Sequence, residues 1–174
     1  MRKLIGLMLV FGLFSLAAVA QENYSKAEVF GGYQYTRLGS DFAGTSLNAN
    51  GWNAALTGNL NHWFGVAADF SGAYKSQSGV SLNTYTYTFG PQLAMRRGGS
   101  FTPFAHALFG GFRSTLTGAP SINGFAFMLG GGTDVKIAKS FDLRAIQFDW
   151  LSLHANGNSA SDNIRISTGV VLHF

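Results

Sequence analysis

The sequence of 174 residues contains no cysteine, only three prolines and few charged residues, at 11%. The lack of cysteine excludes a disulfide scaffold, a thiolate metal site and a cysteine nucleophile. Charged residues are too few, and aromatic residues at 14% too many, for a disordered chain. Beyond the N-terminal segment, no apolar run is long enough for a membrane-spanning helix. Glycine is abundant, with 23 residues, but it follows no Gly-X-Y repeat, so the chain is not collagen-like.

Residues 1–20 are predicted to be a secretory signal peptide. Arg2 and Lys3 precede an apolar run, Leu4 to Leu16, and a small-x-small cleavage site, Ala18-Val19-Ala20. An uncleaved membrane anchor is the alternative, disfavoured because the apolar run is short. Residues 21–174 then form a single domain with its own core. This domain has 10 Lys and Arg against 8 Asp and Glu, without a basic stripe, so nucleic-acid binding is not indicated.

Eight segments of the predicted domain alternate in polarity with a period of two residues, which is typical of β-strands. The segments are Lys26–Arg37, Trp52–Leu60, Trp63–Lys75, Leu82–Arg96, Phe101–Arg113, Gly124–Ile137, Phe141–Leu153 and Asn163–Phe174. The phase of 101–113 is ambiguous. The segment 141–153 slips by one residue between Ala145 and Ile146, which predicts a β-bulge.

The two faces of these segments have inverted polarity compared with a soluble barrel. One face carries bulky residues such as Phe64, Val66 and Phe70, whereas the other carries Gly, Ala, Ser, Thr, Asn and Gln with a few charges. The short connections 61–62, 97–100 and 138–140 alternate with the mostly longer connections 38–51, 76–81, 114–123 and 155–162. Bulky side chains facing lipid, short periplasmic turns and longer external loops are features of outer-membrane barrels. The predicted fold is therefore all-β, an eight-stranded antiparallel up-and-down transmembrane β-barrel with both termini in the periplasm.

Aromatic residues near the strand ends are expected at the two membrane–water interfaces, where amphipathic rings accumulate. Tyr35, Trp52, Tyr74 and Trp150 lie near the long connections, and Phe141 lies near a short one.

Charges on the polar face are expected to form an interior network of ion pairs and hydrogen bonds. An eight-stranded barrel is just wide enough for side chains to fill, and a charge buried there requires a partner. A narrow, gated ion path is the alternative. The predicted members are Glu28, Asp69, Lys75, Asp134, Lys136, Arg144, Asp149 and Arg165.

Together these residues resemble a known family, the small outer-membrane barrels of the OmpA transmembrane-domain and OmpX type. Residues 28–33 and 130–134 are similar to its first and sixth strands. Residues 166–174 are similar to its C-terminal assembly signal, with Thr168, Val170, Leu172 and Phe174 at alternate positions, which implies recognition by the barrel-assembly machinery. The resemblance also implies the outer membrane of a Gram-negative-type bacterium, contact with its lipid and lipopolysaccharide, and a monomer. A peptidoglycan-binding domain is not expected, because the sequence stops at Phe174.

The preferred function is a structural or surface-interaction role, without catalysis or a wide pore, with an extracellular ligand possible at the long loops. A lipid A-modifying enzyme is one alternative. The deacylase type resembles His-x-Ser-Asn, but here His154-Ala155-Asn156-Gly157 places Asn156 where the nucleophilic serine would stand. Ser152 is expected to share a face with His154, but here the serine precedes the histidine, which is the reverse of the order in the motif. A soluble periplasmic barrel that carries a lipid, with its bulky residues inside, is the other alternative.

No cofactor or metal is expected. The sequence has no His-Glu-x-x-His motif and no EF-hand. Gly130-Gly131-Gly132 lacks the Lys-Ser/Thr of a phosphate loop, and we expect these glycines to make room for a neighbouring aromatic ring. His106 is expected to be a hydrogen-bonded filler, and His173 to lie on the interior side of the periplasmic rim.

Overall fold

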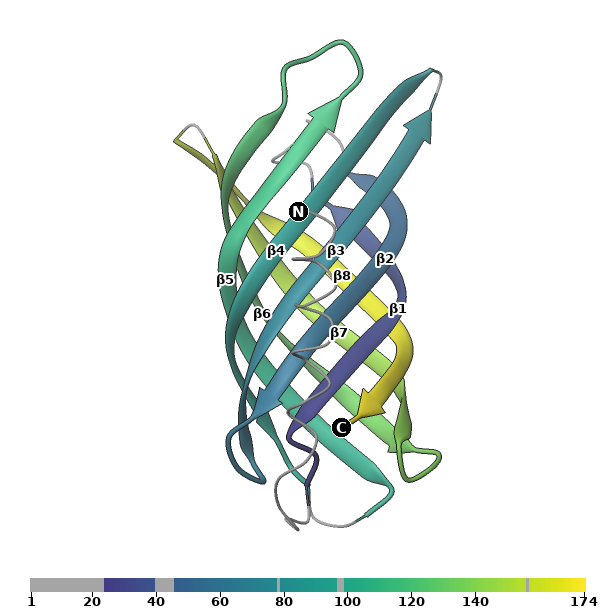
Figure 1. Ribbon diagram of the computed structural model, residues 1–174. Coiled ribbons are helices and arrows are strands. Elements are labelled where there is room, and N and C mark those ends of the chain that lie inside the picture. Colours follow the sequence, from purple (N-terminus) through teal and green to yellow (C-terminus); the bar gives the residue numbers. More distant parts are fainter. Residues whose placement is uncertain (1–23, 40–45, 78, 97–98, 156) are drawn as a thin grey trace, which may run out of the picture.

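The chain folds into a closed antiparallel β-barrel whose strands follow one another in sequence order (Figure 1). The computed structural model describes residues 24–39, 46–77, 79–96, 99–155 and 157–174, so the predicted signal peptide lies outside the described residues. No helix long and apolar enough to cross a membrane is found among the described residues. The strands are β1 (Ala27–Leu38), β2 (Leu47–Asn59), β3 (Phe64–Gln77), β4 (Val80–Ala94), β5 (Phe101–Leu116), β6 (Ile122–Lys136), β7 (Phe141–Ala155) and β8 (Asn158–His173).

Pairing of β1 with β8 closes the barrel. Their register runs from Glu28 opposite His173 to Arg37 opposite Ile164. Closure removes the unpaired edges that an open sheet would present. We call the end at which β1 begins and β8 ends the terminal rim, and the opposite end the distal rim.

The predicted facing of the strands is confirmed. Bulky residues such as Tyr33, Phe70 and Phe148 point outward and are about half exposed, at 53%, 50% and 49%. Polar residues on the alternate positions, such as Asp69 and Asp149, are buried in the interior. The predicted eight-stranded barrel with an apolar outer wall is therefore what the chain forms.

The interior is not filled by small polar residues alone, contrary to the prediction. An apolar layer crosses the lumen, made of Ala67, Leu108, Phe112, Ala126, Met128, Leu151 and Leu153. Small residues would leave voids there, and dense packing is favourable. The layer also explains the ambiguous phase of 101–113. In β5 the inward Leu108 and Phe112 alternate with the outward Phe109, so both faces carry bulky side chains.

Two irregularities occur in the pairing of β7 with β8. The predicted bulge is confirmed by a register shift between Arg144 and Gln147, which lets Ala145 and Ile146 both face outward. A second shift, between Leu151 and Leu153, was not predicted, and its extra residue lies in β8, which advances from Asn163 to Ala160 over the same interval. Ser152 lies opposite Phe127 and His154 opposite Phe125, so these two side chains share the outer face as expected, although Ser152 is buried there and His154 is exposed.

Two predicted loops are largely strand. The prediction of loops at 76–81 and 155–162 is wrong, because β3 pairs with β4 out to Gln77 opposite Val80, and β7 pairs with β8 out to Ala155 opposite Asn158. Gly79 and Gly157 in the turns have positive φ angles of 80° and 78°, which glycine adopts without strain. The prediction ended strands where bulky residues ceased, whereas backbone pairing continues through polar residues. For the same reason β2 begins at Leu47 rather than at Trp52.

Candidate functional site

The centre of the lumen holds a buried cluster built around Arg165. The Arg165 Nη1 and Nη2 atoms donate to the two carboxylate oxygens of Asp69, at 2.7 and 3.0 Å, and Nε donates to Asp149 Oδ2 at 2.8 Å. All three side chains are almost fully buried. Since Arg165 is on β8, Asp69 on β3 and Asp149 on β7, one guanidinium links three strands across the lumen.

Further polar groups complete this central cluster. His106 Nε2 lies 2.8 Å from Asp149 Oδ1, Gln147 Nε2 donates to Asp149 Oδ2 at 2.8 Å, and Asn53 Nδ2 donates to Asp69 Oδ2 at 2.9 Å. A Cβ atom at Gly130 would lie 2.1 Å from Asp149 Oδ1. Glycine at this position therefore makes room for a carboxylate rather than for an aromatic ring. The expected contact with an aromatic ring occurs at the neighbouring Gly132, where a Cβ would lie 3.0 Å from Phe104 Cζ.

A second ion pair lies nearer the terminal rim. Arg144 Nε and Nη2 donate to the two oxygens of Asp134, at 2.8 and 3.0 Å, and Nη1 donates to Gln147 Oε1 at 2.8 Å. The guanidinium carbon lies 4.4 Å from the ring centroid of Phe30 and 4.2 Å from that of Phe104. This arrangement adds cation–π stabilisation to the bidentate ion pair.

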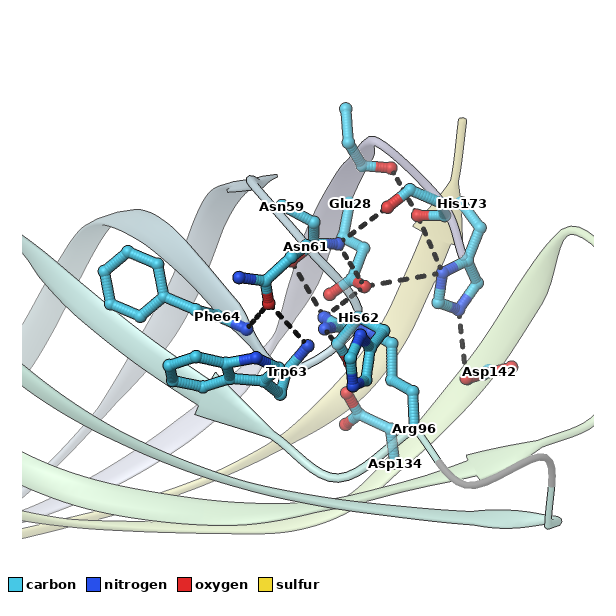
Figure 2. A network of polar contacts seen from close by, with 12 residues as sticks. Glu28, Asn59, Asn61, His62, Trp63, Phe64, Arg96, Asp134, Asp142 and His173 are labelled. Atoms are coloured by element: carbon cyan, nitrogen blue, oxygen red, sulfur yellow. Dashed lines mark hydrogen bonds and ion pairs between the residues drawn. The ribbon is translucent and has the colours of Figure 1, made fainter. Parts of the chain in front are cut away.

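A third cluster occupies the mouth of the barrel at the terminal rim (Figure 2). Arg96 Nη2 donates to Glu28 Oε1 and to Asn59 Oδ1, both at 2.8 Å. His173, whose position on the interior side of this rim was predicted, lies between two acids, with Nε2 2.9 Å from Asp142 Oδ2 and Nδ1 3.9 Å from Glu28 Oε1. Side chains of this cluster line a cavity of about 430 Å³.

The structure brings together most of the predicted interior charges. Glu28, Asp69, Asp134, Arg144, Asp149 and Arg165 are buried and each has an ionic partner. Lys75 is half-buried near the distal rim. The prediction for Lys136 is wrong, because its strand ends at the terminal rim and its side chain is exposed beside the cavity.

Five members of these clusters were not predicted: Asn53, Asn59, Arg96, Asp142 and Gln147. The expectation that His106 is a hydrogen-bonded filler is confirmed by its contact with Asp149. The partner of His106 could not be assigned because His106 lies in the segment of ambiguous phase, and Arg96 lies two residues beyond Ala94, the last residue of β4. A signal existed for Asp142, because it alternates with the outward Phe141 and Leu143.

The five predicted interfacial aromatics, Tyr35, Trp52, Tyr74, Phe141 and Trp150, all point outward and are exposed. Trp52 Nε1 donates to the Tyr74 hydroxyl at 2.9 Å, and the Tyr74 and Tyr85 rings meet edge to face with centroids 5.8 Å apart. Their depth relative to lipid headgroups remains a prediction.

Residues of the predicted assembly signal also lie on the outer wall. Thr168, Val170 and Leu172 are exposed, and the Phe174 N–H donates to the Ala27 carbonyl at 2.9 Å. The terminal segment is therefore tied to the start of β1. Recognition of this segment by an assembly machinery remains a prediction.

The candidate catalytic side chains, Ser152 and His154, form no hydrogen bond with each other. Ser152 Oγ lies 2.9 Å from Ser161 Oγ, whereas the exposed His154 ring lies against Phe125, with centroids 6.3 Å apart. Within the described ranges, no group of three or more His, Cys, Asp or Glu side chains is placed to hold a metal ion.

Comparison with known proteins gives a consistent result. The sequence profile of the family described as "Outer membrane protein beta-barrel domain" matches residues 6–174. No curated protein matches the chain. Neisserial surface protein A (NspA) is similar in structure, with a TM-score of 0.73 and 15% identity over 88% of this chain and 100% of that one.

Ail, the attachment invasion locus protein of Yersinia pestis, is also similar, with a TM-score of 0.63 and 15% identity over 87% of this chain and 99% of that one. A further Ail structure, in complex with the heparin analogue sucrose octasulfate, has a TM-score of 0.56 and 16% identity over 87% of this chain and 99% of that one. At these identities the likeness establishes the fold alone.

The central cluster leads to a prediction about stability. Replacing Arg165 by Met should destabilise the barrel by about 3–5 kcal/mol, because two buried carboxylates lose their cation. Adding Asp69→Asn to Arg165→Met should restore part of this loss, since one of the stranded charges is then removed. Urea unfolding in lipid vesicles measures both variants, and a loss below about 1 kcal/mol for Arg165→Met would contradict the assigned role of the ion pair.

Proposed function

Because this chain belongs to the family of outer membrane β-barrel proteins, we propose that it acts at the cell surface as a non-catalytic interaction protein with a closed lumen. Its location is the outer membrane of a Gram-negative bacterium. The observation that carries the proposal is the combination of a filled interior with hairpins that extend beyond the closed wall at the distal rim.

The filled interior argues against a wide pore. The Arg144–Asp134 pair, the central ion cluster and the apolar layer succeed one another along the lumen from the terminal rim, since Arg144, Asp149 and Leu153 follow one another along β7. Eight-stranded barrels are narrow enough for side chains to fill them. Transport of solutes through the centre therefore has no structural support.

Three hairpins project from the distal rim (Figure 1). The pairing of β1 with β8 stops at Arg37 opposite Ile164, so residues 158–163 of β8 extend beyond β1. Some of these residues remain paired with β7. Likewise, β3 continues past Tyr74, where its pairing with β2 ends. The continuation of these strands beyond their neighbours at the distal rim favours an orientation with the distal rim outside the cell.

Charge suggests the class of partner. The described distal part of the strands carries three basic residues, Arg37, Lys75 and Arg113, and one acidic residue, Asp162. The other described carboxylates lie in the interior or at the terminal rim. Arg37 and Arg113 are exposed on the outer face. Ail has been crystallised in complex with a heparin analogue. A sulfated glycan is therefore the partner class that we propose for the distal surface.

The alternatives are less well supported. A soluble lipid-carrying barrel would require the bulky side chains inside, whereas Tyr33, Phe70 and Phe148 point outward. A lipid A-modifying enzyme would require a serine hydrogen-bonded to a histidine, whereas Ser152 contacts Ser161, and His154, although opposite Ser159 in the sheet, has no hydrogen bond to a serine among the described residues. We also propose that residues 168–174 are read by the barrel-assembly machinery, supported by their alternation and their place at the closing strand, and that the barrel works as a monomer.

Binding of sucrose octasulfate tests the surface role. Arg37→Gln combined with Arg113→Gln should weaken binding to the detergent-solubilised mature barrel severalfold, because the distal rim loses two of its three described positive charges, one on β1 and one on β5 on the opposite side of the barrel. Isothermal titration calorimetry measures the affinity. The control, Lys136→Gln with Lys139→Gln, removes two positive charges at the opposite rim and should change it little. Absence of binding to the wild type, or equal loss in both variants, would contradict the proposed glycan site.

Electrical recording tests the closed lumen. The barrel reconstituted in a planar lipid bilayer should give no sustained conductance steps, because the apolar layer and the paired charges exclude a continuous water column. A diffusion porin in the same bilayer is the positive control. Stable, porin-sized steps from the wild-type barrel would contradict a filled interior.

A further inference from the structure

The cavity at the terminal rim has the properties of a binding site for a small anion. Its volume of about 430 Å³ lies within the range of small-molecule sites. Its inner side is bounded by Phe104, and Asp134 in its wall is held by Arg144, which lies between the Phe30 and Phe104 rings. The cavity therefore has a fixed polar wall on one side and opens at the rim on the other.

Every acid that lines the cavity already has a cationic or hydrogen-bonding partner. Glu28 accepts from Arg96 at 2.8 Å, Asp134 is held by Arg144 at 2.8 Å, and Asp142 lies 2.9 Å from His173. Figure 2 shows Glu28 between Arg96 and His173, with Asp142 on the opposite side of the His173 ring. Arginines of the barrel thus neutralise Glu28 and Asp134, and Asp142 lies beside His173.

Two cationic side chains that line the cavity have no ionic partner among the described residues. Lys136, at the end of β6, and Lys139, in the following turn, both border the cavity and are exposed. Neither forms an ion pair with any side chain in the ranges that the structure describes. Phe174 also borders the cavity, but its main-chain oxygen already accepts the N–H groups of Lys26 and Ala27, at 2.9 and 3.2 Å.

The uncharged lining suits the body of such a ligand. Ser25, Gln92 and Thr102 offer hydroxyl and amide groups, and the Phe104 and Phe174 rings offer apolar surface. Small-molecule sites typically combine apolar surface with a few convergent polar groups. The two lysines give the positive charge that a phosphate or carboxylate requires.

We propose that this cavity binds a small organic anion, with its phosphate or carboxylate at Lys136 and Lys139 and its body against the Thr102 and Phe104 side of the mouth. The site is separate from the distal surface and goes beyond the proposed surface role. It lies at the opposite rim, draws on different side chains and requires no opening of the lumen.

Glucose 6-phosphate, with glucose as its uncharged counterpart, tests the proposal by NMR titration of the mature barrel in detergent micelles. Glucose 6-phosphate should cause saturable shifts of the Thr102, Lys136 and Lys139 amides, whereas glucose should cause none. Lys136→Gln with Lys139→Gln should weaken the affinity about tenfold or more, since both charge-assisted contacts are lost. Both lysines are exposed, so the fold should survive, which the heat-dependent gel mobility of the variant checks.

The matched control is Arg37→Gln with Arg113→Gln, which removes the same charge from the distal rim. It should leave the affinity for glucose 6-phosphate within about twofold of the wild type. Unsaturated shifts at millimolar ligand, equal shifts with glucose, or equal weakening in the two double variants would each overturn the anion site. Loss of glucose 6-phosphate affinity in the Lys136 and Lys139 variant alone, and loss of sucrose octasulfate affinity in the Arg37 and Arg113 variant alone, distinguish the two sites, so failure of one proposal can be told from failure of the other.

Discussion

A charge inside a narrow tube of protein must have a partner, and the rest of this barrel is organised around that constraint. Arg165 meets Asp69 and Asp149, Arg144 meets Asp134, and the partners come from different strands. A slip of one residue in any strand would turn its whole polar set toward the outer wall. The ion pairs therefore specify register as well as filling space. Gly130 illustrates how closely the backbone adapts, since any side chain there would collide with the Asp149 carboxylate.

Side chains of the outer wall and of the interior are stabilised in different ways. Outside, bulky residues need no specific partners, because their surroundings are hydrocarbon in the outer membrane to which the family assigns this protein. Inside, polar groups are satisfied one by one, and a layer that includes Leu108, Phe112 and Leu153 fills the remaining space. Arg37 and Arg113 are exposed at the distal rim, and the terminal mouth carries a cavity lined by charged side chains.

Much of the fold could be predicted from sequence because alternation of side chains is a local property. It gave the eight strands, their facing and the bulge before Gln147, and it placed Asp69, Asp149 and Arg165 inside. Pairing across the lumen is not local, so neither the contact of His106 with Asp149 nor that of Arg96 with Glu28 could be predicted. Strand ends were missed where polar residues continue the backbone pairing, as at Asn158. The exposed side chain of Lys136 was missed because alternation sets the face of a residue but not its distance from the rim.

The central claim is that bulky side chains of the wall contact lipid while a separate set fills the interior. Nuclear Overhauser effects between lipid acyl-chain protons and side-chain methyl groups in lipid nanodiscs measure this contact directly. The methyl groups of Val29, Ile166 and Leu172 should show strong effects, because these side chains are exposed on the outer wall. Those of Leu108, Met128 and Leu153 should show none, because they are buried in the lumen. Acyl-chain contacts to the second set and none to the first would contradict the account.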